Sequence, residues 1–305
     1  MNFAFDFMGR RKIFFVVSLL IILAGLVSLA VNGLNFGIDF TGGTRMLIRM
    51  PGAFTTAEIR EVLAGVEATD ATGRTVTLDN SFIQTVDDNN EVIIRSVPLT
   101  EDEREAVIAA ISQRWTGFTN DNLLQVENVG PVVGGELLRN ALLALLIASA
   151  GIIAYISYRF EFRYAMAALA ALFFDAFVVI MAFSIFRVEL NSPFVAAILT
   201  IVGYSINDTI VVFDRIRENV RYEGDRHLAD TVNLSIRQTL VRSMNTSVTT
   251  LLVVGSLLFL GGDTIRPFAL PLFIGIISGT YSSIFVASPI WYNWRSWGRT
   301  RKARA

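Results

Sequence analysis

The sequence contains no cysteine and only one histidine, His227. These shortages exclude a disulfide framework, iron–sulfur ligation, thiol chemistry and a structural zinc site. Charged residues are also scarce, at 17% of the chain, where a soluble domain carries roughly 25%. The formal net charge of −1 lacks the basic excess that is typical of proteins that bind nucleic acid. The composition therefore argues against both a soluble domain and a nucleic-acid partner.

Apolar residues are abundant instead: they make up 53% of the chain, and the mean hydropathy is +0.52. They form six long runs from which charges are nearly absent. About 20 apolar residues cross a lipid bilayer as a helix, so each run predicts one membrane-spanning helix. The predicted spans are residues 13–31, 137–158, 164–186, 190–213, 242–262 and 267–294. The expected fold class is a polytopic α-helical membrane protein.

Arginine and lysine are distributed unevenly between these spans. If the N-terminus is cytoplasmic, that side holds 16 of them, whereas the short loops opposite hold only Arg187 and Arg266. The cytoplasmic segments would be residues 1–12, 159–163, 214–242 and 295–305. The positive-inside rule therefore predicts two cytoplasmic termini, with a basic tail at 295–305 beside anionic lipid. The first span has features of a signal peptide, but it is long for one and lacks a small-residue cleavage site.

Residues 32–136 form one large acidic segment between the first two spans, with 16 Asp and Glu against 7 Arg. Two capping boxes, at Thr55–Glu58 and Thr100–Glu103, predict helices that end near Glu67 and Gly117. Predicted strands are Thr44–Met50, Thr75–Leu78, Phe82–Val86, Val92–Val97 and Leu123–Val129, with a turn at Asp87–Asn90. This order predicts a small ferredoxin-like α+β domain outside the membrane.

A glycine-rich segment leads from the first span into this domain. Gly37 and Gly42 have the spacing of a phosphate-binding loop, and Asp39 lies between them. The position of the essential lysine is occupied by Gly43, however, so the loop would lack its cation. We therefore interpret the segment as a connection in which backbones approach closely.

Two acids interrupt the apolar runs. An Asp at the centre of a bilayer costs about 2.5–3.5 kcal/mol, so it needs a polar partner or cavity. Asp208 belongs to one polar stripe along the fourth span, and a second stripe follows the fifth. The stripes comprise Thr200, Tyr204, Asn207 and Asp208, and then Arg242, Asn245, Thr246, Thr249 and Ser256. If they pack together, they provide an acid, a cation and hydroxyls, as a proton relay requires.

Two alternatives to the relay remain open. In the first, Asp208 and Arg242 would form a static ion pair that locks two helices. In the second, Arg242 would extend to the cytoplasmic interface. Asp175, on the third span between aromatic neighbours, must face another helix, as a second relay group or as a clamp. On the sixth span, Gly275 and Gly279 predict close helix packing. The segment 214–241 has an amphipathic pattern that favours a connector lying on the membrane surface, with His227 solvated.

Three segments carry a resemblance to a known family: FGIDFTGGT at residues 36–44, GYSINDTIVVFDRIREN at 203–219 and RSMNTS at 242–247. They resemble SecF, a subunit of the bacterial SecDF protein-export complex in the resistance–nodulation–division superfamily, and the resemblance extends over the whole chain. It implies that Asp208 is the proton-titrating acid, that Arg242 is its charge partner, and that Thr246 lies in the pathway. Gly37, Asp39, Gly42 and Gly43 match a family motif.

The resemblance also implies a set of partners and a location. These are SecD, with six further helices and another buried acid, the SecYEG channel, a YajC-type accessory subunit, and the translocating preprotein. It implies an inner-membrane protein with a periplasmic domain, which uses the proton gradient rather than a cofactor and is not an enzyme. Two other functions stay open: a half-transporter that exports a small molecule or lipid, and a passive assembly subunit.

Overall fold

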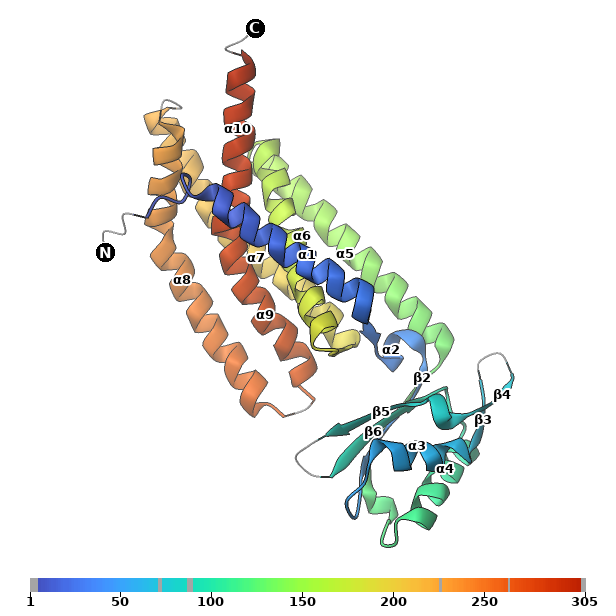
Figure 1. The fold of residues 1–305 in the computed structure, drawn as a ribbon. Helices are drawn as coiled ribbons and strands as arrows, with labels where there is room; N and C mark the ends of the chain where they lie inside the picture. The colour runs from blue at the N-terminus through green and yellow to red at the C-terminus, as the bar shows by residue number, and fades with distance from the viewer. Residues whose placement is uncertain (1–4, 71–72, 87–89, 225–226, 263, 303–305) are drawn as a thin grey trace. The chain divides into compact units, whose positions relative to one another are not determined.

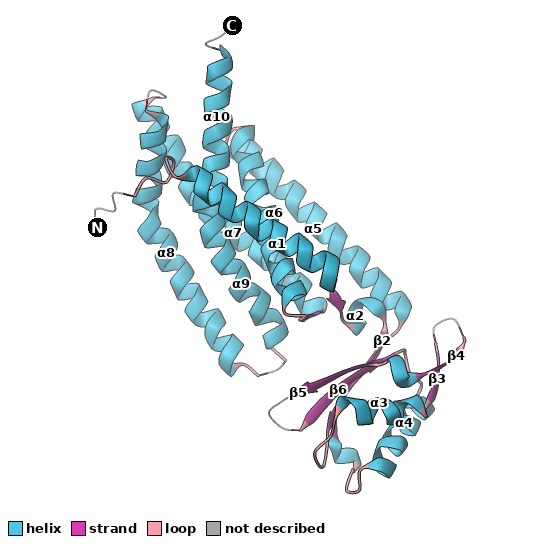
Figure 2. Cartoon of the chain, in the orientation of Figure 1, coloured by secondary structure: helices cyan, strands magenta, loops and turns pink. Residues whose placement is uncertain are grey.

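The chain divides into two compact units, which are described separately. The computed structural model describes residues 5–70, 73–86, 90–224, 227–262 and 264–302. The helical unit comprises the N-terminal segment up to Asn35 together with the chain from Leu143 onward. The β-rich unit comprises Phe36–Leu142 (Figures 1 and 2).

Six helices of the described chain are long and apolar enough to cross a membrane. Their bounds are α1 (Arg11–Asn32), α5 (Pro131–Arg159), α6 (Phe162–Ile185), α7 (Ser192–Glu223), α8 (Leu228–Leu260) and the last span. The last span consists of α9 (Arg266–Ser282), a π-helix η3 (Ser283–Ala287) and α10 (Ser288–Lys302). Residues 303–305 of the expected basic tail lie outside the described residues.

The segment 214–241 differs from its prediction, because it is not a connector lying on a surface. Residues 214–223 continue α7 and residues 228–241 begin α8, so the two spans extend into a helical hairpin. Of the apolar residues that suggested contact with lipid, all but the exposed Leu234 are buried between these helices and their neighbours. They include Ile216, Val220, Leu228, Val232 and Ile236. An amphipathic pattern specifies an apolar face but not what covers it, and here the covering surface is protein.

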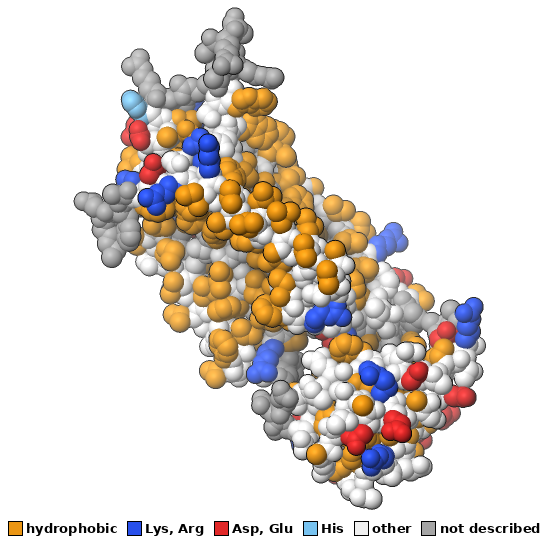
Figure 3. Space-filling model, viewed as in Figure 1, with side chains coloured by type: hydrophobic (Ala, Val, Ile, Leu, Met, Phe, Trp, Pro, Cys, Tyr) orange, Lys and Arg blue, Asp and Glu red, His pale blue; other side chains and the backbone are white. Residues whose placement is uncertain are grey.

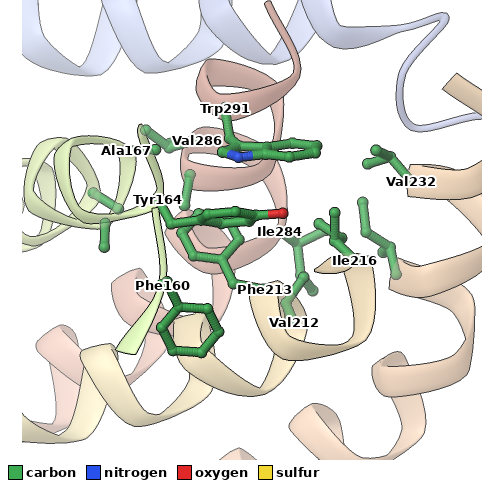
Figure 4. Close-up of a cluster of buried hydrophobic side chains, with 14 of the residues drawn as sticks. Phe160, Tyr164, Ala167, Val212, Phe213, Ile216, Val232, Ile284, Val286 and Trp291 are labelled. Carbon is green, nitrogen blue, oxygen red and sulfur yellow. The ribbon is translucent and has the colours of Figure 1, made fainter. Parts of the chain in front are cut away.

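Aromatic packing joins this hairpin to the third and last spans (Figure 4). The Tyr164 ring stacks on Trp291 at a centroid distance of 4.8 Å and meets Phe213 edge-on at 5.1 Å. The N-terminal segment also packs here, since Met8 is fully buried and its backbone N–H donates to Asn233 Oδ1 at 2.9 Å. The start of α1, the end of α7 and the start of α8 lie at the same end of the unit (Figure 1).

The β-rich unit is built on a four-stranded antiparallel sheet of order β5-β6-β2-β7. Its elements are α2 (Ile38–Thr41), β2 (Gly43–Arg49), α3 (Thr56–Ala64), β5 (Phe82–Val86), β6 (Glu91–Ser96), α4 (Glu101–Arg114) and β7 (Leu123–Val129). The first strand thus pairs with the third and fourth, and a helix follows the first and the third, which is the ferredoxin-like arrangement.

Smaller elements complete the chain. They are β3 (Glu67–Thr69), β4 (Thr75–Thr77), η1 (Leu78–Asn80) and η2 (Asn120–Asn122), with two-residue strands β1 (Asn35–Phe36) and β8 (Glu189–Leu190). The hairpin of β3 and β4 adds a strand that the sequence pattern did not predict. Residues 87–89 of the predicted turn lie outside the described residues.

Regular patterning explains the core of the β-rich unit. Met46 and Ile48 alternate along β2, and Ile59 and Leu63 are four residues apart on α3; all four are fully buried. Both predicted capping boxes are present, with Thr55 paired to Glu58 and Thr100 to Glu103. The helix starts were therefore predictable, whereas both helices end a turn or less before the predicted residue.

Candidate functional site

The last span approaches α7 closely through its glycines. A Cβ atom at Gly275 would lie 2.4 Å from Ile201 Cδ1, and one at Gly279 would lie 3.1 Å from Ser205 Cβ. The close packing predicted from the G-x-x-x-G spacing is therefore confirmed. Because α6 also packs against α7 and α9, polar groups from three helices can meet at this depth.

Asp175, near the middle of α6, is the fully buried acid of this region. Ser205 Oγ of α7 donates to Asp175 Oδ2 at 2.5 Å, and Ser278 Oγ of α9 donates to Oδ1 at 2.6 Å. Ser282 Oγ of α9 also donates to Oδ2, at 2.8 Å. Hydroxyl donors thus replace the water that burial removes from the carboxylate. One side chain joins three helices.

Asp208 lies one turn after Ser205 on α7 and is held differently. Ser283 Oγ donates to Asp208 Oδ2 at 2.5 Å, and it is the one side-chain partner of Asp208 among the described residues. Ser283 is also the first residue of the π-helix η3, and such segments occur frequently at functional sites. Asp208 keeps 8% of its surface exposed, whereas Asp175 keeps none. The two acids therefore differ in access as well as in hydrogen bonding.

The expected charge partner does not meet Asp208 in this chain. Arg242 on α8 is exposed, and its side chain forms no hydrogen bond or ion pair within the part of the chain that the structure describes. Thr246 is exposed too, and its Oγ1 donates to the carbonyl oxygens of Arg242 and Ser243 in its own helix, at 3.0 and 2.9 Å. The static Asp208–Arg242 ion pair that the sequence left open is therefore absent between these described residues.

The two predicted polar stripes meet only in part. Tyr204 on α7 hydrogen-bonds Thr250 on α8 at 3.2 Å between the hydroxyl oxygens, and Thr280 on α9 donates to Ser247 on α8 at 2.7 Å. Asn207 and Thr200 on α7 are exposed. On α8 one exposed polar face remains, which we call the α8 polar face; it comprises Arg242, Asn245, Thr246, Thr249 and Ser256.

The glycine-rich segment belongs to the β-rich unit and is explained by its backbone. The φ angles of Gly42 and Gly43 are 71° and 136°, in the region that favours glycine. A Cβ atom on Gly43 would lie 2.4 Å from the carbonyl oxygen of Ser96. Gly37 caps the four-residue helix α2, and Asp39 occupies its first turn. The prediction of closely approaching backbones is confirmed.

The residues that sequence reasoning missed are serines. Ser278, Ser282 and Ser283 all lie on the last span, and Ser278 and Ser282 are four residues apart on one helix face. Their position beside the G-x-x-x-G motif was a usable signal in the sequence, but it does not reveal which acid they meet. In the described residues, no group of three or more His, Asp or Glu side chains is arranged to hold a metal ion.

Comparison with known proteins decides the family. Residues 111–297 match the family model described as protein export membrane protein SecD/SecF, C-terminal, and residues 27–50 match the SecD/SecF GG motif. The chain belongs to the SecD/SecF family. The first match includes Asp175, Asp208 and Arg242, and the second includes the Gly42–Gly43 pair.

Relatives of similar length and of greater length both align with the chain. SecF of Pseudomonas aeruginosa is 39% identical over 94% of this chain and 91% of its own length, and SecF of Synechocystis is 38% identical over 96% and 95%. SecDF of Bacillus subtilis is 40% identical over 95% of this chain, which spans only 38% of that relative. All three are named as protein translocase subunits, which is not an enzymatic role.

Solved structures support the fold. The crystal structure of a Thermus SecDF, a translocon-associated membrane protein, matches 97% of this chain with a TM-score of 0.84 and 36% identity. The present chain spans 39% of that SecDF chain. The SecD/SecF resemblance, the six membrane-spanning helices and the β-rich domain between the first two of them are thereby confirmed.

Proposed function

We propose that the chain is a SecF-type subunit of a protein translocase accessory complex, in which the proton-motive force promotes preprotein export through the SecYEG channel. Asp208 is the group that takes up and releases the proton. Relatives of similar length are named as translocase subunits, which supports the export part of the proposal. The energy source is inferred from the chemistry of the helical unit.

The observation that carries the proposal is the asymmetric setting of Asp208. A carboxylate inside a membrane span is costly, by about 2.5–3.5 kcal/mol at the bilayer centre, and such residues mark proton or ion pathways. Asp208 is held at one oxygen by Ser283 and keeps 8% of its surface exposed. It therefore combines a fixed position with access for a proton. Asp175, closed on every side, lacks that access.

A second chain would complete the pathway. The α8 polar face is exposed at membrane depth, and hydrocarbon does not satisfy its polar groups. A SecD partner that packs over α7 and α8 would cover this face and bring a further buried acid. In that complex we expect Arg242 to turn toward Asp208 and to favour its ionised form, with Thr246 and Asn207 ordering water nearby.

The proposed location is the inner, or cytoplasmic, membrane, with both termini in the cytoplasm and the β-rich unit in the periplasm. The basic segments follow this orientation under the positive-inside rule. The β-rich unit would there contact emerging preprotein, while SecYEG and a YajC-type subunit associate with the membrane part. No cofactor is required, because the proton gradient supplies the energy.

The test measures proton uptake and gradient-stimulated export per assembled complex in proteoliposomes. Asp208→Asn keeps size and hydrogen bonding but cannot titrate, so both readouts should be lost while ATP-driven export continues at its basal level. Arg242→Ala should lose the same stimulation. Asp230→Asn is the matched control, since this carboxylate on α8 is 82% exposed and should change neither readout.

Three outcomes would contradict the proposal. If the Asp208→Asn complex still couples proton uptake to export, the proposed relay role of Asp208 is refuted. Reduced assembly with intact coupling in the surviving complex would favour a passive assembly subunit. Proton uptake stimulated by small molecules or lipids, and not by preprotein, would favour a half-transporter.

A further inference from the structure

The two buried acids are connected through consecutive residues of the last span. Ser282 donates to Asp175, and the next residue, Ser283, donates to Asp208. On the other side, Ser205 donates to Asp175 and lies three residues before Asp208 on α7. The hydrogen bonds and the two helix backbones therefore form a closed loop around the acids. A shift at one acid must be accommodated at the other.

The backbone of the last span between the two serines and α10 needs support from side chains of neighbouring helices. Residues Ser283–Ala287 are π-helical, and Ser288 Oγ donates to the carbonyl oxygen of Ser283 at 3.0 Å. A π-helical turn is wider than an α-helical turn and is rare, so the angular position of its first residue depends on the contacts that support it. Asp175 binds Ser278 and Ser282, which form the last turn of α9 before the π-helix.

Asp175 differs from a proton carrier in its surroundings. The residue has no exposed surface, and serine hydroxyls occupy both carboxylate oxygens. The serine that binds Asp208 is a different one, Ser283, so no single hydroxyl bridges the two acids among the described hydrogen bonds. The contacts hold helices in place and give a proton no continuous path between the carboxylates.

We propose that Asp175 is a positioning residue for Asp208: it fixes Ser282 so that the neighbouring Ser283 stays within hydrogen-bond distance of the Asp208 carboxylate. The inference rests on the proposed function only in taking Asp208 as the titrating group. Of the two interpretations of Asp175, relay group or clamp, it selects the clamp. It adds that this clamp maintains the hydrogen bond of Asp208.

The experiment uses the assembled complex with its partner in proteoliposomes and two readouts. The first is the infrared carboxyl or carboxylate band of Asp208, identified as the band that Asp208→Asn removes, whose frequency reports the hydrogen bond from Ser283. The second is proton flux per assembled complex. The variants are Asp175→Asn, Asp175→Ala, Ser282→Ala and Ser283→Ala.

Ser184→Ala is the matched control. Ser184 is a fully buried serine on α6, the helix of Asp175, and it hydrogen-bonds Ser28 on α1 at 2.9 Å. Its removal costs a buried contact between helices without touching either acid. The Asp208 band and the flux should both stay as in the unmodified complex.

Asn at position 175 can still accept and donate hydrogen bonds, and Ser282 has the Gly279 carbonyl oxygen as an alternative acceptor at 3.3 Å. Asp175→Asn should therefore keep the Asp208 band and most of the flux. Asp175→Ala and Ser282→Ala should move the band toward its position in Ser283→Ala. They should lower the flux about tenfold, which corresponds to about 1.4 kcal/mol in the barrier.

Two results would overturn the proposal. If Asp175→Asn abolishes flux as fully as Asp175→Ala while the Asp208 band stays unshifted, Asp175 is itself a proton carrier. If neither Ser282→Ala nor Asp175→Ala shifts the band, Asp175 does not position Ser283; Ser282→Ala decides this even where Asp175→Ala fails to assemble. Normal flux in Asp208→Asn would refute the proposed function instead, and the band shifts would still decide the positioning role.

Discussion

Both units bury apolar side chains, but they differ in the acids they bury and in the side chains they expose. In the β-rich unit, Met46 and Ile59 are fully buried, and acidic residues are spread over the visible surface (Figure 3). In the helical unit, Asp175 is fully buried, whereas Leu146 is 66% exposed and Leu260 is 85% exposed. Hydrophobic side chains cover most of its visible face (Figure 3).

The difference shows that the two units of one chain are stabilised in different solvents, water for the β-rich unit and lipid for the helical unit. In water, burial of apolar surface stabilises a domain by about 25 cal/mol per Å². Between helices in lipid that driving force is absent, so association depends on close packing of small residues and on hydrogen bonds between helices. Gly275, Gly279 and the serines around Asp175 provide both. Polar groups therefore have the organising role in the helical unit that apolar groups have in the other.

The largest expected difference is in the accessibility of the two units to a reagent that cannot cross the membrane. Because the chain lacks cysteine, single cysteines can report sidedness. Gln113→Cys, exposed on α4, should react with a membrane-impermeant thiol reagent added from the periplasmic side. Tyr222→Cys, at an 81% exposed position near the end of α7, should react only after the membrane is opened. Labelling of both positions, or of residue 222 alone, would contradict the six-span orientation.

The next largest difference is expected when an exposed residue of each unit is replaced by aspartate. Leu146→Asp, near the centre of α5, should disfavour insertion by about 2.5–3.5 kcal/mol, because the position faces hydrocarbon. Gln113→Asp, exposed on α4, should change stability by no more than about 0.5 kcal/mol. The amount of membrane-inserted chain that resists alkaline extraction measures the effect. Equal tolerance of both substitutions would mean that α5 is not surrounded by lipid.

Backbone packing in the β-rich unit gives a smaller effect. Gly43→Ala combines a φ of 136° with a Cβ position 2.4 Å from the Ser96 carbonyl oxygen, so it should destabilise the sheet by about 1–3 kcal/mol. Gly73→Ala, with a φ of 79° and nothing within 4 Å, is the matched control and should cost only about 1 kcal/mol. Hydrogen exchange at the amides of β2 and β6 measures the difference. Equal protection in the two variants would refute the role of close approach.

The smallest expected effect is on the stability of the β-rich unit at low pH. The Thr100 backbone N–H lowers the pKa of the Glu103 carboxyl from its ordinary value of 4.5; burial opposes this, and the Thr69 backbone N–H adds to it. Since the pKa is lower in the folded state, the stabilisation is present above pH 4.5 and is lost as the pH falls through the folded value.

Glu103→Gln should therefore remove part of the acid sensitivity of the β-rich unit while leaving its stability at pH 3 nearly unchanged. Amide exchange at Thr69 and Thr100 between pH 3 and pH 6 provides the measurement. An unchanged pH dependence would show that the capping box contributes nothing measurable to this unit. The helical unit should not respond to the substitution at any pH.

Much of the fold followed from local patterns. Strands β5 and β7 have the predicted bounds, and both capping boxes begin the expected helices, because strand alternation and capping are local properties. The sequence predicted a surface connector where α7 and α8 extend into a hairpin with a buried apolar face, because an amphipathic pattern does not identify what covers that face. The pairing of Asp175 with Ser278 and Ser282 also escaped prediction, since it joins residues 103 and 107 positions apart.

The sequence alone determined how many helices enter the membrane, where the acidic β-rich domain lies between them, and which two acids interrupt the apolar runs. These are consequences of the solvent and of local geometry, and they need no knowledge of packing. Only the tertiary structure decided that three serines bind Asp175, that one serine binds Asp208, and that Arg242 is exposed and paired with neither acid among the described residues. A hydrogen bond depends on ångström-scale distances between helices, which the order of residues along any one helix does not specify.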